Sequence, residues 1–415
     1  MPQPDHSRHA GPAALDVERI HESLADARRR LAARDAEVVR DQVTVTEIAA
    51  PTGDESRRAA WVARRFVALG LADVRTDDAG NVIGRRPGAA TRERGREQAP
   101  VVVCAHLDTV FPADTALAIR RDGARLVGPG IGDNGRGLTA MLALAAEIDG
   151  TRVRTRRPVD FVATTGEEGR GDLRGAKHFF ATGEPAAAAL IVDGPGDERI
   201  VHRALGSRRF RVTVRGPGGH SWAAFGVANA VHAIAGLAAR LAALALPAEP
   251  RTTLSVGRIG GGISVNAIPD EAWLEVDLRS TAPAMIDRFE AELRLAARVA
   301  LAEENARRAR GTPPLTQEIV SIGDRPCGEL PADEPLVAAA AAATRLVGRV
   351  PELSTASTDA NVPISLGVPA VAIGAGGRGG DAHTTAEWFD NTDGTLGIGR
   401  ALTILVAAAG LEQNE

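Results

Sequence analysis

The chain has 415 residues, of which 44% are hydrophobic and 3% aromatic, with no tyrosine and a formal net charge of -4 at pH 7. This length and apolar content predict two or three domains with a large core. The slight acidity and the scarcity of aromatic side chains exclude a general electrostatic or stacking surface for nucleic acid or an anionic membrane.

The start of the chain and its cysteines bear on the compartment. Residues 1–14 are polar and lack an apolar signal core, so we expect a disordered tail. Two cysteines, Cys104 and Cys327, cannot form a disulfide framework, which fits a reducing, cytoplasmic location. No run of about 18 apolar residues occurs, so we expect no membrane span.

The first predicted elements are a helix over residues 15–41, where apolar residues recur at spacings of three and four, and a buried strand within residues 101–110. His106 and Asp108 end this strand and share one face, because residues i and i+2 of a strand point the same way. Such a pair can make a metal ligand and the group that orients it. Taken alone, the pattern fits a polar strand end with a hydrogen-bonded histidine better.

Later segments of the chain place acidic residues in a loop and directly after two further predicted strands. A glycine-rich loop at residues 128–137 lacks the lysine and the spacing of a phosphate-binding loop, so we interpret it as a tight bend that aims Asp133 at a site. Glu167 and Glu168 follow one apolar strand, and Asp193 follows the next. Sites in open α/β sheets form where such strands end, so we expect these groups to meet.

The pattern changes near residue 203, where a β-α-β-β-α order predicts an inserted α+β domain over residues 203–315. Residues 15–202 and 316–415 are predicted to form the catalytic domain. Its late glycine-rich stretch leads to His383. The predicted fold is α/β: a mixed, mostly parallel sheet flanked by helices, with the inserted α+β domain.

The candidate residues together suit a pair of divalent metals, which needs carboxylate and imidazole ligands around a bridging carboxylate. Nitrogen and oxygen ligands without thiolate favour zinc, with cobalt or manganese as alternatives. A spare glutamate can take a proton from water and pass it to a leaving amine. The candidates are His106, Asp108, Asp133, Glu167, Glu168, Asp193 and His383.

Over roughly residues 106–390 the chain resembles the co-catalytic zinc peptidases and deacylases: carboxypeptidase G, acetylornithine deacetylase, succinyl-diaminopimelate desuccinylase, aminoacylase and peptidase T. The resemblance rests on these motifs: His106-Leu107-Asp108, Gly132-Asp133-Asn134-Gly135, Gly166-Glu167-Glu168-Gly169, Val192-Asp193-Gly194 and Ala382-His383-Thr384.

The resemblance implies two metal ions with Asp133 as the bridging ligand and a cis peptide after it. It implies Glu167 as general base and acid, and Asp108 as the group that orients His106. The implied ligand sets are His106, Asp133 and Asp193 for one ion, and Asp133, Glu168 and His383 for the other.

The resemblance implies that the inserted domain is a lid and dimerisation domain. It makes His220 a lid histidine that polarises the scissile carbonyl, often in the partner subunit of a homodimer. It makes Asn266 and Arg279 substrate-binding residues, and a guanidinium suits a carboxylate on physical grounds too. The family usually has a proline soon after the lid histidine. Here residues 221–225 are Ser-Trp-Ala-Ala-Phe instead, which affects the expected substrate pocket and not the metal site.

We therefore predict a dizinc hydrolase that cleaves amide bonds of small peptides, as an aminopeptidase, dipeptidase or tripeptidase, by metal-activated water with Glu167 as base. In the family, aspartate at the position of Asp193 accompanies recognition of a free amino terminus, and residues 357–361 look most like the peptidase T branch. The alternatives are an N-acyl-amino-acid deacylase or carboxypeptidase of the same family, and a non-catalytic homologue. The last is disfavoured because Asp133 and Glu167 are both present.

Overall fold

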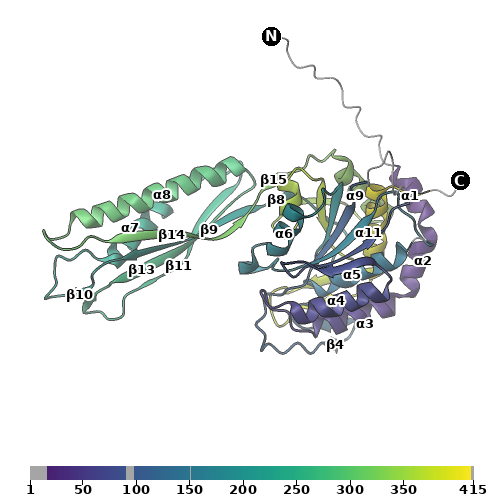
Figure 1. Ribbon diagram of the computed structural model, residues 1–415, viewed down its shortest axis with the longest axis horizontal. Helices are drawn as coiled ribbons and strands as arrows, with labels where there is room; N and C mark the ends of the chain where they lie inside the picture. The colour runs from purple at the N-terminus through teal and green to yellow at the C-terminus, as the bar shows by residue number, and fades with distance from the viewer. Residues whose placement is uncertain (1–15, 90–97, 150, 413–415) are drawn as a thin grey trace, which may run out of the picture.

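The computed structural model describes residues 16–89, 98–149 and 151–412, so the predicted tail at residues 1–14 lies outside the described residues. Two bodies are visible: a larger α/β body and an elongated one that projects from it (Figure 1). No described helix has the length and apolar character needed to cross a membrane.

The larger body is built on a sheet in the order β1-β2-β6-β3-β7-β17-β8-β15, with β16 beside β8. The central strands β6, β3, β7 and β17 run parallel, and antiparallel pairs complete both sides. This confirms the predicted mixed, mostly parallel sheet. The strands are β1 (Ala72–Thr76), β2 (Val82–Arg86), β3 (Val101–His106), β6 (Val159–Thr164), β7 (Ala188–Val192), β8 (Arg199–Ala204), β15 (Gly328–Glu329), β16 (Glu352–Ala356) and β17 (Ala370–Ile373).

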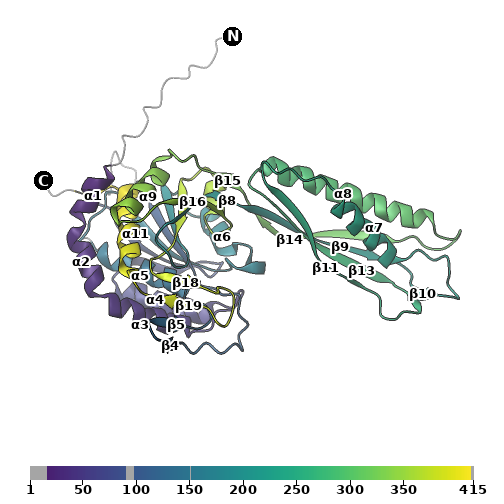
Figure 2. The ribbon, with the colours of Figure 1, turned by 180° about the vertical axis from the view of Figure 1, so that it is seen from behind.

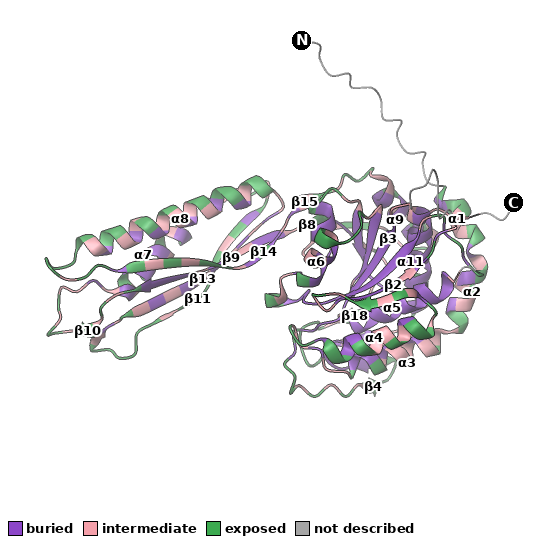
Figure 3. Ribbon diagram, in the orientation of Figure 1, coloured by how far each residue is buried: buried purple, intermediate pink, exposed green. Residues whose placement is uncertain are grey.

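Helices cover both faces of this sheet, which is why its central strands are buried throughout (Figure 3). On β3, Val101 and Val103 face the larger helical layer, whereas Val102 and Cys104 face the smaller one. The larger layer is α1 (Val17–Ser23), α2 (Ala25–Ala33), α3 (Asp35–Thr46), α4 (Ser56–Ala68), α5 (Gly135–Glu147), α9 (Pro335–Leu346) and α11 (Gly394–Ala409). The smaller layer is α6 (Arg174–Thr182) and α10 (Asn361–Ser365).

The single helix expected over residues 15–41 is instead three short helices, α1, α2 and α3. The chain leaves helical geometry at Leu24 (φ -91°, ψ 10°) and at Arg34 (φ -98°, ψ 7°). Each piece packs on a different neighbour: α1 on α9, α2 on α11, and α3 on α5. The breaks therefore let one apolar stripe follow a curved surface.

The projecting body is a four-stranded antiparallel sheet, β11-β13-β9-β14, with α7 and α8 packed on one face (Figure 2). Along β13, alternate residues are buried under the helices, which leaves Asp277 and Arg279 on the open face. β14 pairs with β9, so the inserted sheet extends to Arg325. The elements are β9 (Gly206–Arg215), β10 (Gly219–His220), α7 (Ala230–Ala242), β11 (Thr252–Gly261), β12 (Ala267–Ile268), β13 (Glu271–Ser280), α8 (Pro283–Ala306) and β14 (Thr316–Arg325).

A second small sheet, β18-β19-β5-β4, lies on the larger body and carries the loop at residues 381–387, which contains His383. Its strands are β4 (Arg120–Asp122), β5 (Arg125–Val127), β18 (Arg378–Gly380) and β19 (Trp388–Asp390), and the short 3-10 helix Gly169–Gly171 follows the Glu167–Glu168 turn.

Candidate active site

The candidate ligands gather where the central parallel strands end. β3 ends at His106, β6 leads to the turn with Glu168, and β7 leads to Asp193. Asp133 comes from the loop before α5, and His383 from the bend between β18 and β19. Donor atoms of His106, Asp133 and Asp193 lie within 4.8 Å of one another, and so do those of Asp133, Glu168 and His383.

Asp133 lies between the two histidines and offers one oxygen to each. Its Oδ1 is 2.9 Å from His106 Nε2, and its Oδ2 is 3.2 Å from His383 Nε2. His106 Nε2 is also 3.8 Å from Asp193 Oδ1, and His383 Nε2 is 3.0 Å from Glu168 Oε1. The two groups thus have the membership expected for two metal ions that share Asp133, and the Asp133–Asn134 peptide is cis.

The donor chemistry fits a divalent cation. Hydrogen bonding to Asp133 and the charge of Glu168 raise the pKa of His383 to about 9. Burial alone would raise the pKa of Asp133, but hydrogen bonds and the charges of His106 and His383 lower it below its ordinary value. The carboxylates therefore attract positive charge to this point, and a ligand set of imidazole and carboxylate without thiolate suits zinc.

Asp108 organises both the His106 ring and the glutamate turn. Its backbone oxygen accepts a hydrogen bond from His106 Nδ1 at 3.0 Å, whereas its Oδ1 lies 3.6 Å from that nitrogen. The carboxylate accepts the backbone N–H groups of Glu167 and Glu168, each at 2.9 Å, and the hydroxyl of Thr52 at 2.8 Å. Because a carbonyl only accepts, Nδ1 carries the proton and Nε2 is left to bind a metal.

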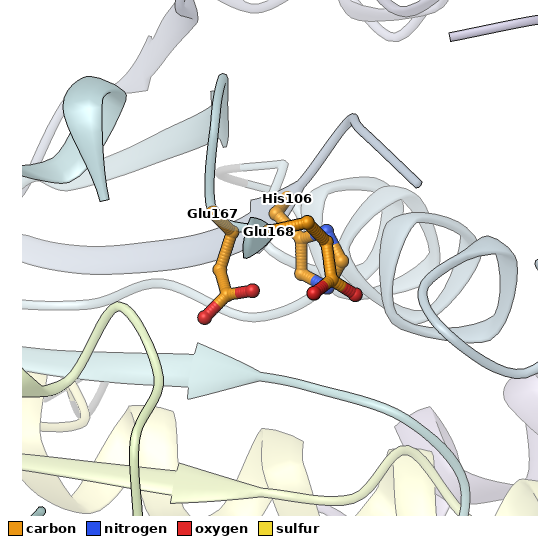
Figure 4. Close-up of side chains that lie close together, drawn as sticks. All are labelled: His106, Glu167 and Glu168. Carbon is orange, nitrogen blue, oxygen red and sulfur yellow. The ribbon is translucent and has the colours of Figure 1, made fainter. Parts of the chain in front are cut away.

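Glu167 comes from the same turn as Glu168 and forms a third group with Glu168 and His106, in which one donor atom of each residue lies within 4.8 Å of the others. Figure 4 shows the Glu167 carboxylate beside that of Glu168, which overlaps the His106 ring in this view. Glu167 is buried, and burial raises its pKa well above the ordinary value. Its Oε1 is 3.3 Å from Nη1 of Arg325, which also donates to Ser357 Oγ at 3.2 Å.

Three residues of this site were not singled out from the sequence. Arg325 is the last residue of β14 and pairs with Glu167. Glu387 accepts the backbone N–H groups of Gly130, Gly132 and Asp133 at 2.7–2.8 Å and so holds the metal-site loop. Asp359 is buried and accepts the hydroxyl of Thr164 at 2.5 Å. Each acts across a long sequence separation. Asp359 lies within residues 357–361, whose resemblance to the peptidase T branch gave Asp359 no role, and Arg325 and Glu387 lie in no motif singled out from the sequence.

The residues predicted in the inserted domain fall in two places. Arg279 lines a pocket of about 510 Å³ together with the metal-site residues. His220 and Asn266 lie at the far end of the projecting body, around β10, and both are exposed (Figure 1). The fold therefore does not bring His220 or Asn266 to the metal-site residues of the same chain.

Residues 102–407 match the family described as peptidase family M20/M25/M40. The chain belongs to this family. The match covers most of the chain, and it confirms both the resemblance seen in the motifs and the prediction of a metal-dependent peptidase at the level of the family.

Individual proteins agree with this membership. A probable carboxypeptidase of Aspergillus clavatus is 28% identical over 269 residues, which is 60% of this chain and 58% of that protein, so the chain matches less than two thirds of its curated relative. The aminopeptidase PepT of Bacillus cereus has a similar fold, with a TM-score of 0.71, 22% identity, and coverage of 90% of this chain and 98% of that chain. The YXEP protein of Bacillus subtilis, a dinuclear metal-binding peptidase, aligns with a TM-score of 0.65, 17% identity, and coverage of 91% and 99%.

Proposed function

We propose that this protein is a two-zinc aminopeptidase that cleaves small peptides. The observation that carries the proposal is the pair of ligand groups that share Asp133, with the carboxylate of Glu167 next to them on the same pocket wall. His106, Asp133 and Asp193 would hold one ion, and Asp133, Glu168 and His383 the other. When bound, the ions would supply Lewis-acid polarisation of the scissile carbonyl and would acidify a water molecule.

Glu167 is proposed to move the proton during the reaction. As general base it takes a proton from the attacking water, and as general acid it returns that proton to the leaving amine. Burial raises the pKa of Glu167 above the ordinary value of a carboxyl, which favours return of the proton to the leaving amine. Arg325 holds the carboxylate in place through the ion pair described above.

The proposed substrate has a free amino terminus and a free carboxylate. Asp193 would face the amino-terminal side, and Arg279 on the sheet of the projecting body would bind the carboxylate. The name of the PepT relative supports an aminopeptidase. The name of the Aspergillus relative favours the second candidate, a carboxypeptidase, and an N-acyl-amino-acid deacylase would use the same machinery.

The test compares Ala-Ala-Ala with N-acetyl-alanine, with added zinc or cobalt and after chelation. We expect metal-dependent cleavage of the tripeptide from its amino terminus. Glu167→Gln should lower kcat by about 10²–10⁴-fold with the metal content unchanged, because the proton acceptor is lost. Glu318→Gln, an exposed glutamate on β14, serves as the matched control with unchanged kcat.

Each other outcome is informative. Cleavage of N-acetyl-alanine alone would replace the peptidase by a deacylase, and release of the last residue would replace the aminopeptidase by a carboxypeptidase. Failure of the protein to cleave either compound with two metals bound would contradict the proposed function.

We also propose a cytoplasmic homodimer in which His220 of a second copy completes the site. This is supported by the distant position of His220 and by exposed apolar side chains next to it, Trp222 and Phe225, each 88% exposed. Ile263 and Val265 belong to the same end of the body, because β10 pairs with β12 and Ser221 N bonds to Asn266 O at 2.9 Å.

A further inference from the structure

Arginine side chains form much of the active-site pocket wall. Arg199 is on β8 of the larger body. The other three come from the sheet of the projecting body, here called the lid sheet: Arg209 on β9, Arg279 on β13 and Arg325 at the end of β14. Guanidinium groups bind carboxylates in a planar, two-bonded geometry. The wall therefore has more capacity for anions than one substrate carboxylate requires.

The ion pairs of these arginines leave positive charge without an acidic partner. Arg325 pairs with Glu167, and Arg209 and Arg279 share the single carboxylate of Asp277, at 3.0 and 2.6 Å. Within the described part of the chain, no carboxylate lies within ion-pair distance of Arg199. The other carboxylates on this wall are Asp133, Glu168 and Asp193, which are the candidate metal ligands. Two positive charges therefore have no carboxylate of their own among the described residues: one of the two guanidinium groups that share Asp277, and that of Arg199.

Arg199 is held firmly at the wall beside Asp193. It is the first residue of β8, and the next residue, Ile200, pairs with Ile373 at the end of β17. Its Nη2 donates to the backbone oxygen of Asp193 at 3.0 Å, and its own carbonyl accepts from Arg400 Nη2 at 3.3 Å. The half-buried guanidinium is therefore positioned before any substrate arrives, which reduces the entropy lost on binding.

We propose that Arg199 forms an anion-binding subsite on the amino-terminal side of the scissile bond, and that the substrates are peptides whose first residue is aspartate or glutamate. The proposal rests on the proposed function, which places the substrate's amino-terminal side at Asp193 and its terminal carboxylate at Arg279. The side-chain carboxylate then pairs with Arg199. A substrate with two carboxylates neutralises both charges that the chain leaves unmatched.

The experiment compares Glu-Ala-Ala with its isosteric amide Gln-Ala-Ala on the zinc-loaded protein. We expect kcat/KM to be about tenfold higher for Glu-Ala-Ala, mainly through KM, because the pairing adds a charge-assisted hydrogen bond. In Arg199→Gln the ratio should fall towards one, and Arg199→Lys should restore part of it. Arg203→Gln is the control: it is on the same strand, exposed and paired with Glu329 at 2.9 Å, and should keep the ratio.

A second measurement separates the subsite from the catalytic activity. Calorimetric titration of the chelated protein with the same two peptides should show tighter binding of Glu-Ala-Ala, and Arg199→Gln should abolish the difference. Arg199→Glu should reverse the preference in favour of Lys-Ala-Ala, which shows that the variant is folded and that charge decides the selection.

The outcomes distinguish the two proposals. Equal kcat/KM and equal binding for the two peptides would overturn the subsite and leave the peptidase intact. If Arg199→Gln lowers kcat/KM equally for both peptides, Arg199 only supports Asp193. That result would also overturn the proposed subsite. If no peptide is cleaved, the proposed function fails, and the calorimetric preference alone then decides the subsite.

Discussion

Asp108 illustrates how one side chain can serve several neighbours at the metal site. Its carboxylate accepts two backbone N–H groups and a hydroxyl, while its carbonyl fixes the His106 ring. Hydrogen bonds to a charged acceptor are worth about 1.5–3 kcal/mol each. The expected role of orienting His106 thus falls to the backbone of Asp108, and its carboxylate shapes the turn that carries Glu167 and Glu168.

Asp359 gives a prediction about pH. Burial raises its pKa to about 6, although the hydrogen bond from Thr164 acts in the opposite direction. A carboxyl whose pKa is higher in the folded state than in the unfolded state makes its full contribution to the free energy of unfolding below a pH of about 4. That contribution is lost as the pH rises through 6. Asparagine at this position cannot ionise, so it avoids that loss.

We therefore expect the stability of Asp359→Asn relative to the wild type to increase by about 3 kcal/mol between pH 4 and pH 7. Urea unfolding of the metal-free proteins across this range measures the difference. A difference that is constant with pH, or one that decreases, would show that Asp359 is ionised throughout.

Among the elements, α11 shows how a helix gains its stability from packing. Its Leu402 is fully buried between the sheet and the neighbouring helices, whereas Leu396, on the same helix, is 37% exposed. Leu402→Ala should lower the free energy of unfolding by about 3 kcal/mol, because it removes buried contacts and leaves a cavity.

The matched variant Leu396→Ala should cost less, about 1 kcal/mol, because its side chain is partly exposed and its removal leaves no enclosed cavity. Urea unfolding of both variants provides the comparison. Equal costs at the two positions would mean that helix propensity, rather than burial against the sheet, sets the stability of α11.

For the molecule as a whole, the separation of His220 from the metal-site residues makes the proposed dimer testable. Phe225 is 88% exposed in the single chain and is expected to be covered by the second copy. Phe225→Ser should shift the protein from dimer to monomer in light scattering and lower peptide hydrolysis in parallel, because each site would lose the partner's histidine.

Val67→Ser provides the control, since Val67 is 63% exposed on α4 in the other body and should not affect association. A wild-type protein that is monomeric at micromolar concentration and fully active would contradict the proposed assembly.

Much of the fold follows from local patterns. The apolar β-branched runs predict β3, β6 and β7, and the placement of polar residues after them predicts where His106, Glu168 and Asp193 converge. These predictions succeed because buried parallel strands require continuous apolar runs and end at a common edge. The division of the N-terminal helix into three was missed, because the curvature of the underlying surface is not encoded in periodicity.

By itself, the sequence determined the architecture, the family and the ligand-type residues, because these depend on short motifs and on the spacing of apolar residues. Only the tertiary structure decided which distant groups support the site: Arg325 on Glu167, Glu387 under the Asp133 loop, and beside Asp193 the guanidinium of Arg199, which has no carboxylate within ion-pair distance among the described residues. It also decided that His220 lies away from the candidate metal ligands of its own chain. The physical reason is that ion pairs and buried hydrogen bonds depend on positions in space, and residues far apart in the chain meet only after the sheets have formed.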